Sequence, residues 1–258
     1  MSRSIFVRQL VPATIEELWA ACSTAQGMAS WQADEVVGDA ARADRITLSW
    51  PALKLSLELT VKEVVPQQRI TFGVGASQLT VELEPGAVSL THVGLHSDDE
   101  AEGMRSAWQT SLGLLAHALV QHPGRTRRVH WITRPARTTA ALAHVYFSEP
   151  MALSQWLTRA GSVGAVGSNI ALQLMTGEVA TGVVHANAVD RDVAFSWIEQ
   201  QNSYVVFRTF PSPRASDERL LAIAWSRWHS EAFPEPTAQF LNAALGRLAH
   251  LLERRGLA

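Results

Sequence analysis

The sequence Leu-Gly-Leu-Leu-Ala-His-Ala-Leu at residues 112–119 returns almost unchanged at residues 245–252 as Leu-Gly-Arg-Leu-Ala-His-Leu-Leu. In both copies leucine occupies positions i, i+3 and i+7, which form one stripe of an α-helix that can pack against an apolar surface. The same shift of 133 residues places His96-Ser97-Asp98 on His229-Ser230-Glu231. We interpret the repeat as a duplication, in which each copy is the long closing helix of one half.

Length and composition fit two domains of ordinary size. The chain has 258 residues, of which 47% are hydrophobic and 18% are charged, as in globular proteins. The stretch His122-Pro123-Gly124-Arg125-Thr126 breaks the first copy of the helix. We therefore expect one domain over residues 1–122, a linker over 123–126 and a second domain over 127–258.

Net charge, the length of apolar runs and cysteine content argue against nucleic-acid binding, membrane insertion and an internal disulfide. The formal net charge of −2 lacks the basic excess of a nucleic-acid-binding protein, so no nucleic acid is expected. No apolar run approaches the roughly 20 residues of a membrane span, so no membrane insertion is expected. The single cysteine, Cys22, rules out an internal disulfide and suits a reducing compartment. We expect a cytoplasmic protein.

Hydrophobic periodicity predicts the order of the elements. In the first half a strand covers residues 4–10, and Thr14 with Glu17 has the spacing of a helix capping box. From Arg45 onward apolar and polar residues alternate, which predicts antiparallel strands with one apolar face, the last of them over 88–95. The second half repeats this order, with a strand at 128–134, a helix at 138–147, a strand at 178–189 and a hairpin over 204–228 whose extended turn covers 211–218.

This order of elements resembles the START-like, or helix-grip (SRPBCC), superfamily. A narrower set of motifs is similar to the bacterial homologues of the activator of heat shock protein 90 ATPase: Glu63-Val64-Val65-Pro66, Arg69-Ile70-Thr71-Phe72, Val81-Glu82-Leu83-Glu84-Pro85, Leu90-Thr91-His92, Gly103, Trp108 and Leu112. The second half keeps fewer of these matches, among them Arg191, Phe195 and Trp197. The resemblance implies an α+β fold of two tandem helix-grip domains, each a curved antiparallel sheet wrapped around a long C-terminal helix.

The resemblance also implies a cavity between sheet and helix that holds a small hydrophobic ligand. His92 has the parity of Val88 and Leu90 along the strand, so it points inward if they do. An inward His92 could be either a hydrogen-bonded core residue or a ligand contact, and both interpretations remain open. We assign the ligand-binding set Trp31, Trp50, Phe72, His92 and Trp108. No catalytic residue, metal or cofactor is assigned, because the common catalytic and phosphate-binding motifs are absent.

Three functions follow from these observations. The first is non-catalytic binding or carrying of a small hydrophobic molecule. The second is a cyclase or aromatase acting on a hydrophobic substrate, with His92 moving protons. The third is a protein-binding accessory factor, with a chaperone or another protein as its partner. The missing catalytic motifs favour the first.

The two halves differ where a ligand would bind. The shift of 133 residues places Trp225 at the position of His92 and Leu241 at that of Trp108. An indole is much larger than an imidazole, so an inward Trp225 would fill the second cavity. We therefore expect the ligand mainly in the first half. Small residues on the opposing strand, including Gly182, would leave room for the indoles.

Two further interpretations concern arginines. In the strand around residues 203–210, either Arg208 points inward beside Tyr204 and Val206, or the alternate set Val205, Phe207 and Thr209 does. Parity alone leaves both open. The arginines near the linker, Arg125, Arg127 and Arg128, are interpreted as a solvated patch.

Overall fold

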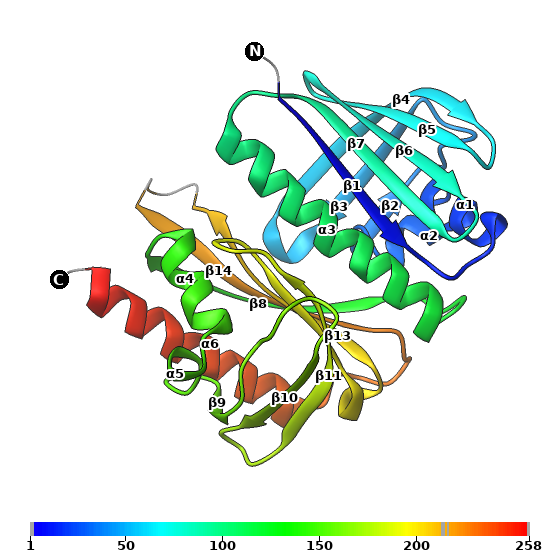
Figure 1. The fold of residues 1–258 in the computed structure, drawn as a ribbon. Coiled ribbons are helices and arrows are strands. Elements are labelled where there is room, and N and C mark those ends of the chain that lie inside the picture. The colour runs from blue at the N-terminus through cyan, green and yellow to red at the C-terminus, as the bar shows by residue number, and fades with distance from the viewer. Residues whose placement is uncertain (1–2, 213–214, 216, 257–258) are drawn as a thin grey trace. The chain divides into compact units, whose positions relative to one another are not determined.

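A computed structural model of the chain describes residues 3–212, 215 and 217–256. The chain forms two compact units, Met1–Arg128 and Val129–Ala258, here called domain 1 and domain 2. Figure 1 shows that each combines one sheet with one long helix. The division falls after Arg128, beyond the end of the expected linker at Thr126. The expected turn over 211–218 includes residues 213, 214 and 216, which lie outside the described residues.

Domain 1 contains a seven-stranded antiparallel sheet, a pair of short helices and one long helix. Its strands lie in the order β1-β7-β6-β5-β4-β3-β2, and the long helix α3 packs on β1 and β7 (Figure 1). The strands are β1 (Arg3–Leu10), β2 (Glu35–Val37), β3 (Arg45–Trp50), β4 (Leu55–Val65), β5 (Arg69–Val74), β6 (Ser77–Glu84) and β7 (Ala87–Leu95). The helices are α1 (Ile15–Ser23), α2 (Ala25–Ala29) and α3 (Asp98–Gln121), with a 3-10 turn η1 (Pro51–Leu53).

Domain 2 has the same architecture, with the strand order β8-β14-β13-β12-β11-β10-β9 and the long helix α6 against β14. Its strands are β8 (Arg128–Arg137), β9 (Thr158–Ala160), β10 (Asn169–Leu174), β11 (Val179–Asn187), β12 (Val193–Trp197), β13 (Ser203–Pro211) and β14 (Glu218–Arg227). Its helices are α4 (Ala140–Ser148), α5 (Pro150–Leu153) and α6 (Glu235–Gly256), with a 3-10 turn η2 (Ile198–Gln200). The identical orders confirm the α+β fold of two tandem helix-grip domains.

Local side-chain hydrogen bonds start the helices of domain 1. Thr14 and Glu17 form the predicted capping box, in which the Glu17 N–H donates to Thr14 Oγ1 over 3.2 Å and the Thr14 N–H donates to Glu17 Oε2 over 2.8 Å. Ser97 caps α3 by accepting from the Glu100 N–H at 3.1 Å. The acidic first turn of α3 complements the positive end of the helix dipole.

The duplication extends to single hydrogen bonds. The indole N–H of Trp31 donates to the carbonyl of Ala21 at 3.0 Å, and that of Trp156 donates to the carbonyl of Tyr146 at 2.8 Å. Both bonds span ten residues and tie the segment after the second short helix of a pair to the C-terminal half of the first. The repeat therefore preserves an internal contact as well as the element order.

The interior of domain 2 is filled by aromatic rings. Phe207 lies 5.5 Å from Trp156, between ring centroids, and Trp225 lies 5.9 Å from Trp197 and 5.0 Å from Phe233. Trp225 is fully buried and belongs to the hydrophobic core of this domain. Its indole therefore points inward, as the comparison with His92 suggested.

Gly182 on β11 is small for a different reason from the one expected. A Cβ atom added there would collide with the backbone carbonyl oxygen of Ser196, and would lie 2.7 Å from that carbonyl carbon. The close approach of two backbones, rather than the bulk of an indole, excludes a side chain at this position.

The structure decides the orientation of β13. Val205 and Phe207 belong to the hydrophobic core of domain 2, so their set faces inward. Arg208 instead pairs with buried Asp192, with its Nη2 atom 2.9 Å from Asp192 Oδ2. Arg208 is therefore not an inward site for an anionic ligand.

The first strand of domain 2 runs further than expected. We predicted that it ends at Arg134, but β8 continues through Pro135 to Arg137. Since β8 is the edge strand of its sheet, the missing N–H of a proline can face the open side without breaking the ladder.

The side chain of Arg127 is buried, which corrects its place in the expected solvated patch, whereas Arg125 and Arg128 are exposed as expected. Arg127 Nη1 donates to the carbonyl of Trp31 at 3.0 Å, and its Nη2 donates to the carbonyl of Ala33 at 2.8 Å. The same Nη2 atom lies 3.5 Å from Asp34 Oδ1. Only 5% of the Arg127 side chain is exposed, and this burial lowers the pKa of Arg127 to about 10 against the opposing effect of Asp34. The guanidinium still carries its charge at neutral pH and fastens the segment after α3 to the loop after α2.

Candidate functional site

Two residues of the predicted set share one row of the domain 1 sheet. Phe72 on β5 lies opposite Leu79 on β6, and Leu79 lies opposite His92 on β7. Directly opposed residues of an antiparallel pair point to the same face, and these three are each 2% exposed. Phe72 and His92 therefore face the interior, as predicted.

His92 is held by two neighbours. The indole N–H of Trp108 on α3 donates to His92 Nδ1 at 3.3 Å, and His92 Nε2 lies 2.8 Å from the Ser77 hydroxyl oxygen. The Ser77 hydroxyl itself donates to the carbonyl of Val74 at 2.8 Å. These bonds assign the proton of a neutral imidazole to Nε2, which donates to Ser77. Burial lowers the pKa of His92, which favours this neutral form.

Domain 2 keeps the serine but not the histidine. Val205 lies opposite Trp225, as Leu79 lies opposite His92, and Ser203 stands where Ser77 stands in domain 1. The indole N–H of Trp225 donates to the Ser203 hydroxyl at 2.9 Å. The equivalent serine of domain 2 thus holds an indole ring, which has no acid–base function. This parallel favours the core-histidine alternative.

The other two members of the predicted set lie elsewhere. Trp50 ends β3 and pairs with Leu55, on the same face as the buried residues Ile46 and Leu48, but it is only half-buried. Trp31 follows α2, is buried and donates its indole N–H to the carbonyl of Ala21 on α1. The structure therefore brings together Phe72, His92 and Trp108, places Trp50 at the end of the same sheet face and holds Trp31 against α1.

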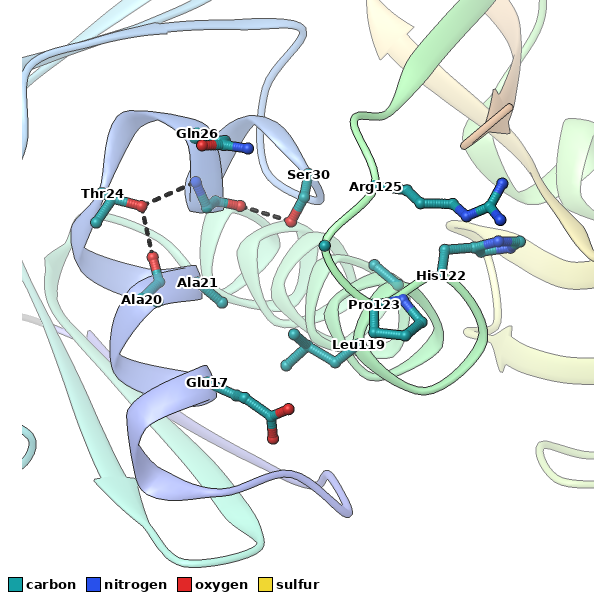
Figure 2. A pocket seen from close by; sticks show the side chains of 13 residues that line it. Glu17, Ala20, Ala21, Thr24, Gln26, Ser30, Leu119, His122, Pro123 and Arg125 are labelled. Carbon is teal, nitrogen blue, oxygen red and sulfur yellow. Dashed lines mark hydrogen bonds between the residues drawn. The ribbon is translucent and has the colours of Figure 1, made fainter. Parts of the chain in front are cut away.

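A cavity of about 280 Å³ opens between the helix pair and the end of α3 (Figure 2). We call it the helix crevice. One wall comes from α1 and α2: Glu17, Ala20, Ala21, Thr24, Gln26, Gly27 and Ser30. The other comes from the end of α3 and the segment after it: Ala118, Leu119, His122, Pro123, Gly124 and Arg125. None of the predicted set lines it, although Trp31 is bonded to one of its wall residues.

Small residues shape the first wall of the helix crevice. Gly27 lies so close to the end of α1 that an added Cβ would collide with the carbonyl of Ala20 and lie 2.7 Å from Ala21 Cα. The two helices can meet at this angle only because Gly27 has no side chain. Sequence reasoning missed this wall. The available signal was the pair Ala20-Ala21 in α1 followed by Gly27.

The Gly27→Ala variant should lose about 1–3 kcal/mol of stability, because the new methyl group meets rigid backbone. Gly103→Ala is the matched control, since it lies within α3 and its added Cβ would have nothing within 4 Å. The control should gain about 0.5–1 kcal/mol from helix propensity. Urea unfolding of both variants measures the difference. Equal effects at the two positions would show that α1 and α2 do not touch as described.

Both hydroxyl groups on the α1–α2 wall are already hydrogen-bonded within the helix pair. The Thr24 hydroxyl donates to the carbonyl of Ala20 at 2.7 Å and accepts from the Gly27 N–H at 3.0 Å. The Ser30 hydroxyl donates to the carbonyl of Gly27 at 2.6 Å. In Figure 2, Leu119 lies toward α1, whereas the side chains of His122 and Arg125 point away from it. The helix crevice therefore offers a largely apolar surface.

Within the described ranges, no group of three or more His, Cys, Asp and Glu side chains is arranged to hold a metal ion. The helices of the same ranges include none with both the length and the apolar character needed to cross a membrane.

A comparison with known families finds a match within domain 1. Residues 12–120 match the family model described as activator of Hsp90 ATPase homolog 1-like protein. This match confirms the resemblance noted for the first half of the sequence, and it ends before domain 2 begins. No curated protein matches the chain.

Solved structures similar to the chain include one- and two-domain proteins. DynU16, from the dynemicin biosynthetic locus, is 17% identical over 96% of this chain and 98% of its own, with a TM-score of 0.41. The di-domain ARO/CYC protein StfQ of the steffimycin biosynthetic pathway is 8% identical over 99% of this chain and 100% of its own, with a TM-score of 0.44. The Aha1 dimer from Colwellia psychrerythraea is 17% identical over 50% of this chain and 96% of its own, with a TM-score of 0.42.

Proposed function

Because domain 1 has a helix-grip fold, a kind that generally binds small molecules or associates with Hsp90, we propose that the chain binds a small apolar molecule in domain 1 and leaves it chemically unchanged. The observation that carries this proposal is the helix crevice, a cavity of about 280 Å³ with largely apolar walls. Its volume is close to the lower end of the range for small-molecule sites. We place the ligand there.

The absence of a reaction is supported by the state of His92. A general base needs a lone pair directed at its substrate. Nδ1 of His92 already accepts from Trp108, and Nε2 is bonded to Ser77. Proton transfer to a substrate would require breaking one of these buried bonds. The ring is better suited to fixing β7 against α3.

The assignment to domain 1 is supported by the contrast with domain 2. Where domain 1 has His92, domain 2 has Trp225, stacked on Trp197 and in contact with Phe233. Interiors packed with such rings leave little room for a ligand. Domain 2 then serves as a structural partner of domain 1, and we expect one ligand per chain.

The predicted set provides the alternative location. A ligand between the sheet and α3 would contact Trp50, Phe72 and Trp108 beside His92, and would have to displace packed side chains. A substitution in the helix crevice and a substitution between the sheet and α3 should have different effects on binding, so the two together show which location holds the ligand.

A titration of the full chain with fatty acids and fused-ring aromatics, read by tryptophan fluorescence, tests the proposal. Ala20 is exposed on α1 and lines the helix crevice, so Ala20→Leu should fill the space and weaken binding by about tenfold. Glu16→Leu, on the same helix but outside the lining, is the control. His92→Trp should leave binding intact. No response to any compound, or binding lost in His92→Trp and kept in Ala20→Leu, would overturn the assignment.

A second candidate function follows from the family match. The name of that family refers to activators of the Hsp90 ATPase, so a chaperone-associated accessory role is the runner-up. Co-purification of the chain with an Hsp90-type chaperone, undiminished in Ala20→Leu, would favour this role over ligand binding.

A further inference from the structure

We propose that the ligand of the helix crevice joins an apolar body to a positively charged amine, and that Glu17 binds the amine. This inference rests on the proposed function and adds the chemical class of the ligand. It rests on the hydrogen bonds of the two hydroxyl groups, on the carboxylate of Glu17 and on the direction of the two basic side chains of the cavity.

The hydroxyl groups of the α1–α2 wall are poor partners for a ligand. Thr24 both donates and accepts within the helix pair, and Ser30 donates its proton to a backbone carbonyl. With these donors already used, the surface between them and Leu119 recognises mainly apolar groups. Beyond Gln26 and Glu17, no side chain of this wall is left to pair with hydroxyl groups of a ligand, so several such groups would cost affinity.

Glu17 differs from these groups because only one of its carboxylate oxygens has a hydrogen-bond partner. Oε2 accepts from the Thr14 N–H at 2.8 Å, whereas Oε1 forms no hydrogen bond or ion pair with any described residue. A carboxylate has about four acceptor positions, so most of its capacity is free. Figure 2 shows the carboxylate on the side of α1 that faces Leu119 and the end of α3.

The position of Glu17 is fixed before a ligand arrives. The capping box holds its side chain against the first turn of α1, which removes part of the entropic cost that a free surface glutamate would have on binding. A held carboxylate at the edge of an apolar cavity matches a cation attached to an apolar body.

The wall formed by the end of α3 and the segment after it does not reverse the preference for a cationic ligand. The two basic residues there, His122 and Arg125, point away from α1 in Figure 2, so their side chains are not directed at a ligand beside Glu17. A carboxylate-bearing ligand such as a fatty acid would meet the like charge of Glu17 without a facing cation. We expect such anions to bind more weakly than the matched amine.

Three probes with the same bicyclic body test the inference: 1-naphthylmethylamine, 1-naphthylmethanol and 1-naphthylacetate, titrated calorimetrically into the full chain. The wild type should bind the amine about fivefold more tightly than the alcohol, the size of a partly exposed ion pair, and the acetate most weakly. Added salt should reduce the difference.

The decisive variant is Glu17→Gln, because glutamine removes the charge and can still accept the capping bond from Thr14. It should bind the amine and the alcohol equally well. Glu16→Gln removes a charge from the same turn but does not line the cavity, so it should keep the preference. Helix content and unfolding temperature confirm that both variants fold.

The outcomes separate the two proposals. If wild type binds the amine and the alcohol equally, or if Glu17→Gln keeps the preference, the amine class is wrong while binding of an apolar molecule stands. If none of the three probes binds, both this inference and the proposed use of the helix crevice are overturned.

Discussion

Trp225→Ala should destabilise domain 2 by about 3–5 kcal/mol, the range for removing a large buried aromatic side chain. Trp225 is fully buried, stacks on Trp197, contacts Phe233 and donates its indole N–H to Ser203. Truncation would remove these contacts and leave a cavity that the β-sheet backbone cannot close. Urea unfolding, followed by tryptophan fluorescence and circular dichroism, measures the loss.

Trp50→Ala in domain 1 is the matched control for this truncation. Trp50 is only half-buried at the end of β3, so its removal should cost distinctly less than that of Trp225. If Trp225→Ala cost less than about 1 kcal/mol, domain 2 would not be filled as described, and the reason for placing the ligand in domain 1 would be lost.

Arg127→Ala should destabilise domain 1 by a similar amount, about 3–5 kcal/mol, because it breaks a buried charge interaction on one side only. The carbonyls of Trp31 and Ala33 would lose their guanidinium donors, and Asp34 would lose the cation 3.5 Å from its Oδ1 atom. The segment that forms one wall of the helix crevice would also lose its attachment. Thermal and urea unfolding measure the effect.

Arg42→Ala is the control for charge alone, since Arg42 is exposed in the same domain. Its removal should change stability by less than about 0.5 kcal/mol. A loss at Arg127 no greater than that at Arg42 would contradict the burial of the guanidinium. Arg127→Lys should restore only part of the stability, because one ammonium group cannot reach both carbonyls with the geometry of a planar guanidinium.

The sequence predicted the fold well because its repeat, its hydrophobic periodicity and its helix-capping residues all indicated the same order of elements. The repeated leucine stripe separated the two halves, and the alternation of apolar residues in β3 to β7 revealed one buried face. The inward direction of His92 followed from its parity with Leu90. Thr14 and Glu17 predicted a helix start that the hydrogen bonds confirm.

The features that sequence reasoning missed depend on distances between segments. β13 is buried on both faces over Ser203–Phe207, so its residues no longer alternate and parity had no signal to offer. Arg127 looks like any linker arginine until the carbonyls of Trp31 and Ala33 are placed around it. The helix crevice arises from the close approach of α1 and α2 at Gly27, which local periodicity cannot show.

The comparison of the two domains explains why His92 can be interpreted in two ways. Ser77 and Ser203 hold equivalent places, yet one is bonded to an imidazole and the other to an indole. From sequence alone, an inward histidine suggests acid–base chemistry. Beside its counterpart in domain 2, it is the smaller of two rings that secure the last strand of a sheet.

The central claim is that the helix crevice of domain 1 binds a small apolar molecule, and a crystal structure of the full chain with the tightest compound from the fluorescence screen tests it most directly. We expect density for the compound between α1, α2 and residues 118–125, with no compound in domain 2. Density between β7 and α3, or inside the sheet of domain 2, with the helix crevice unoccupied, would contradict the claim.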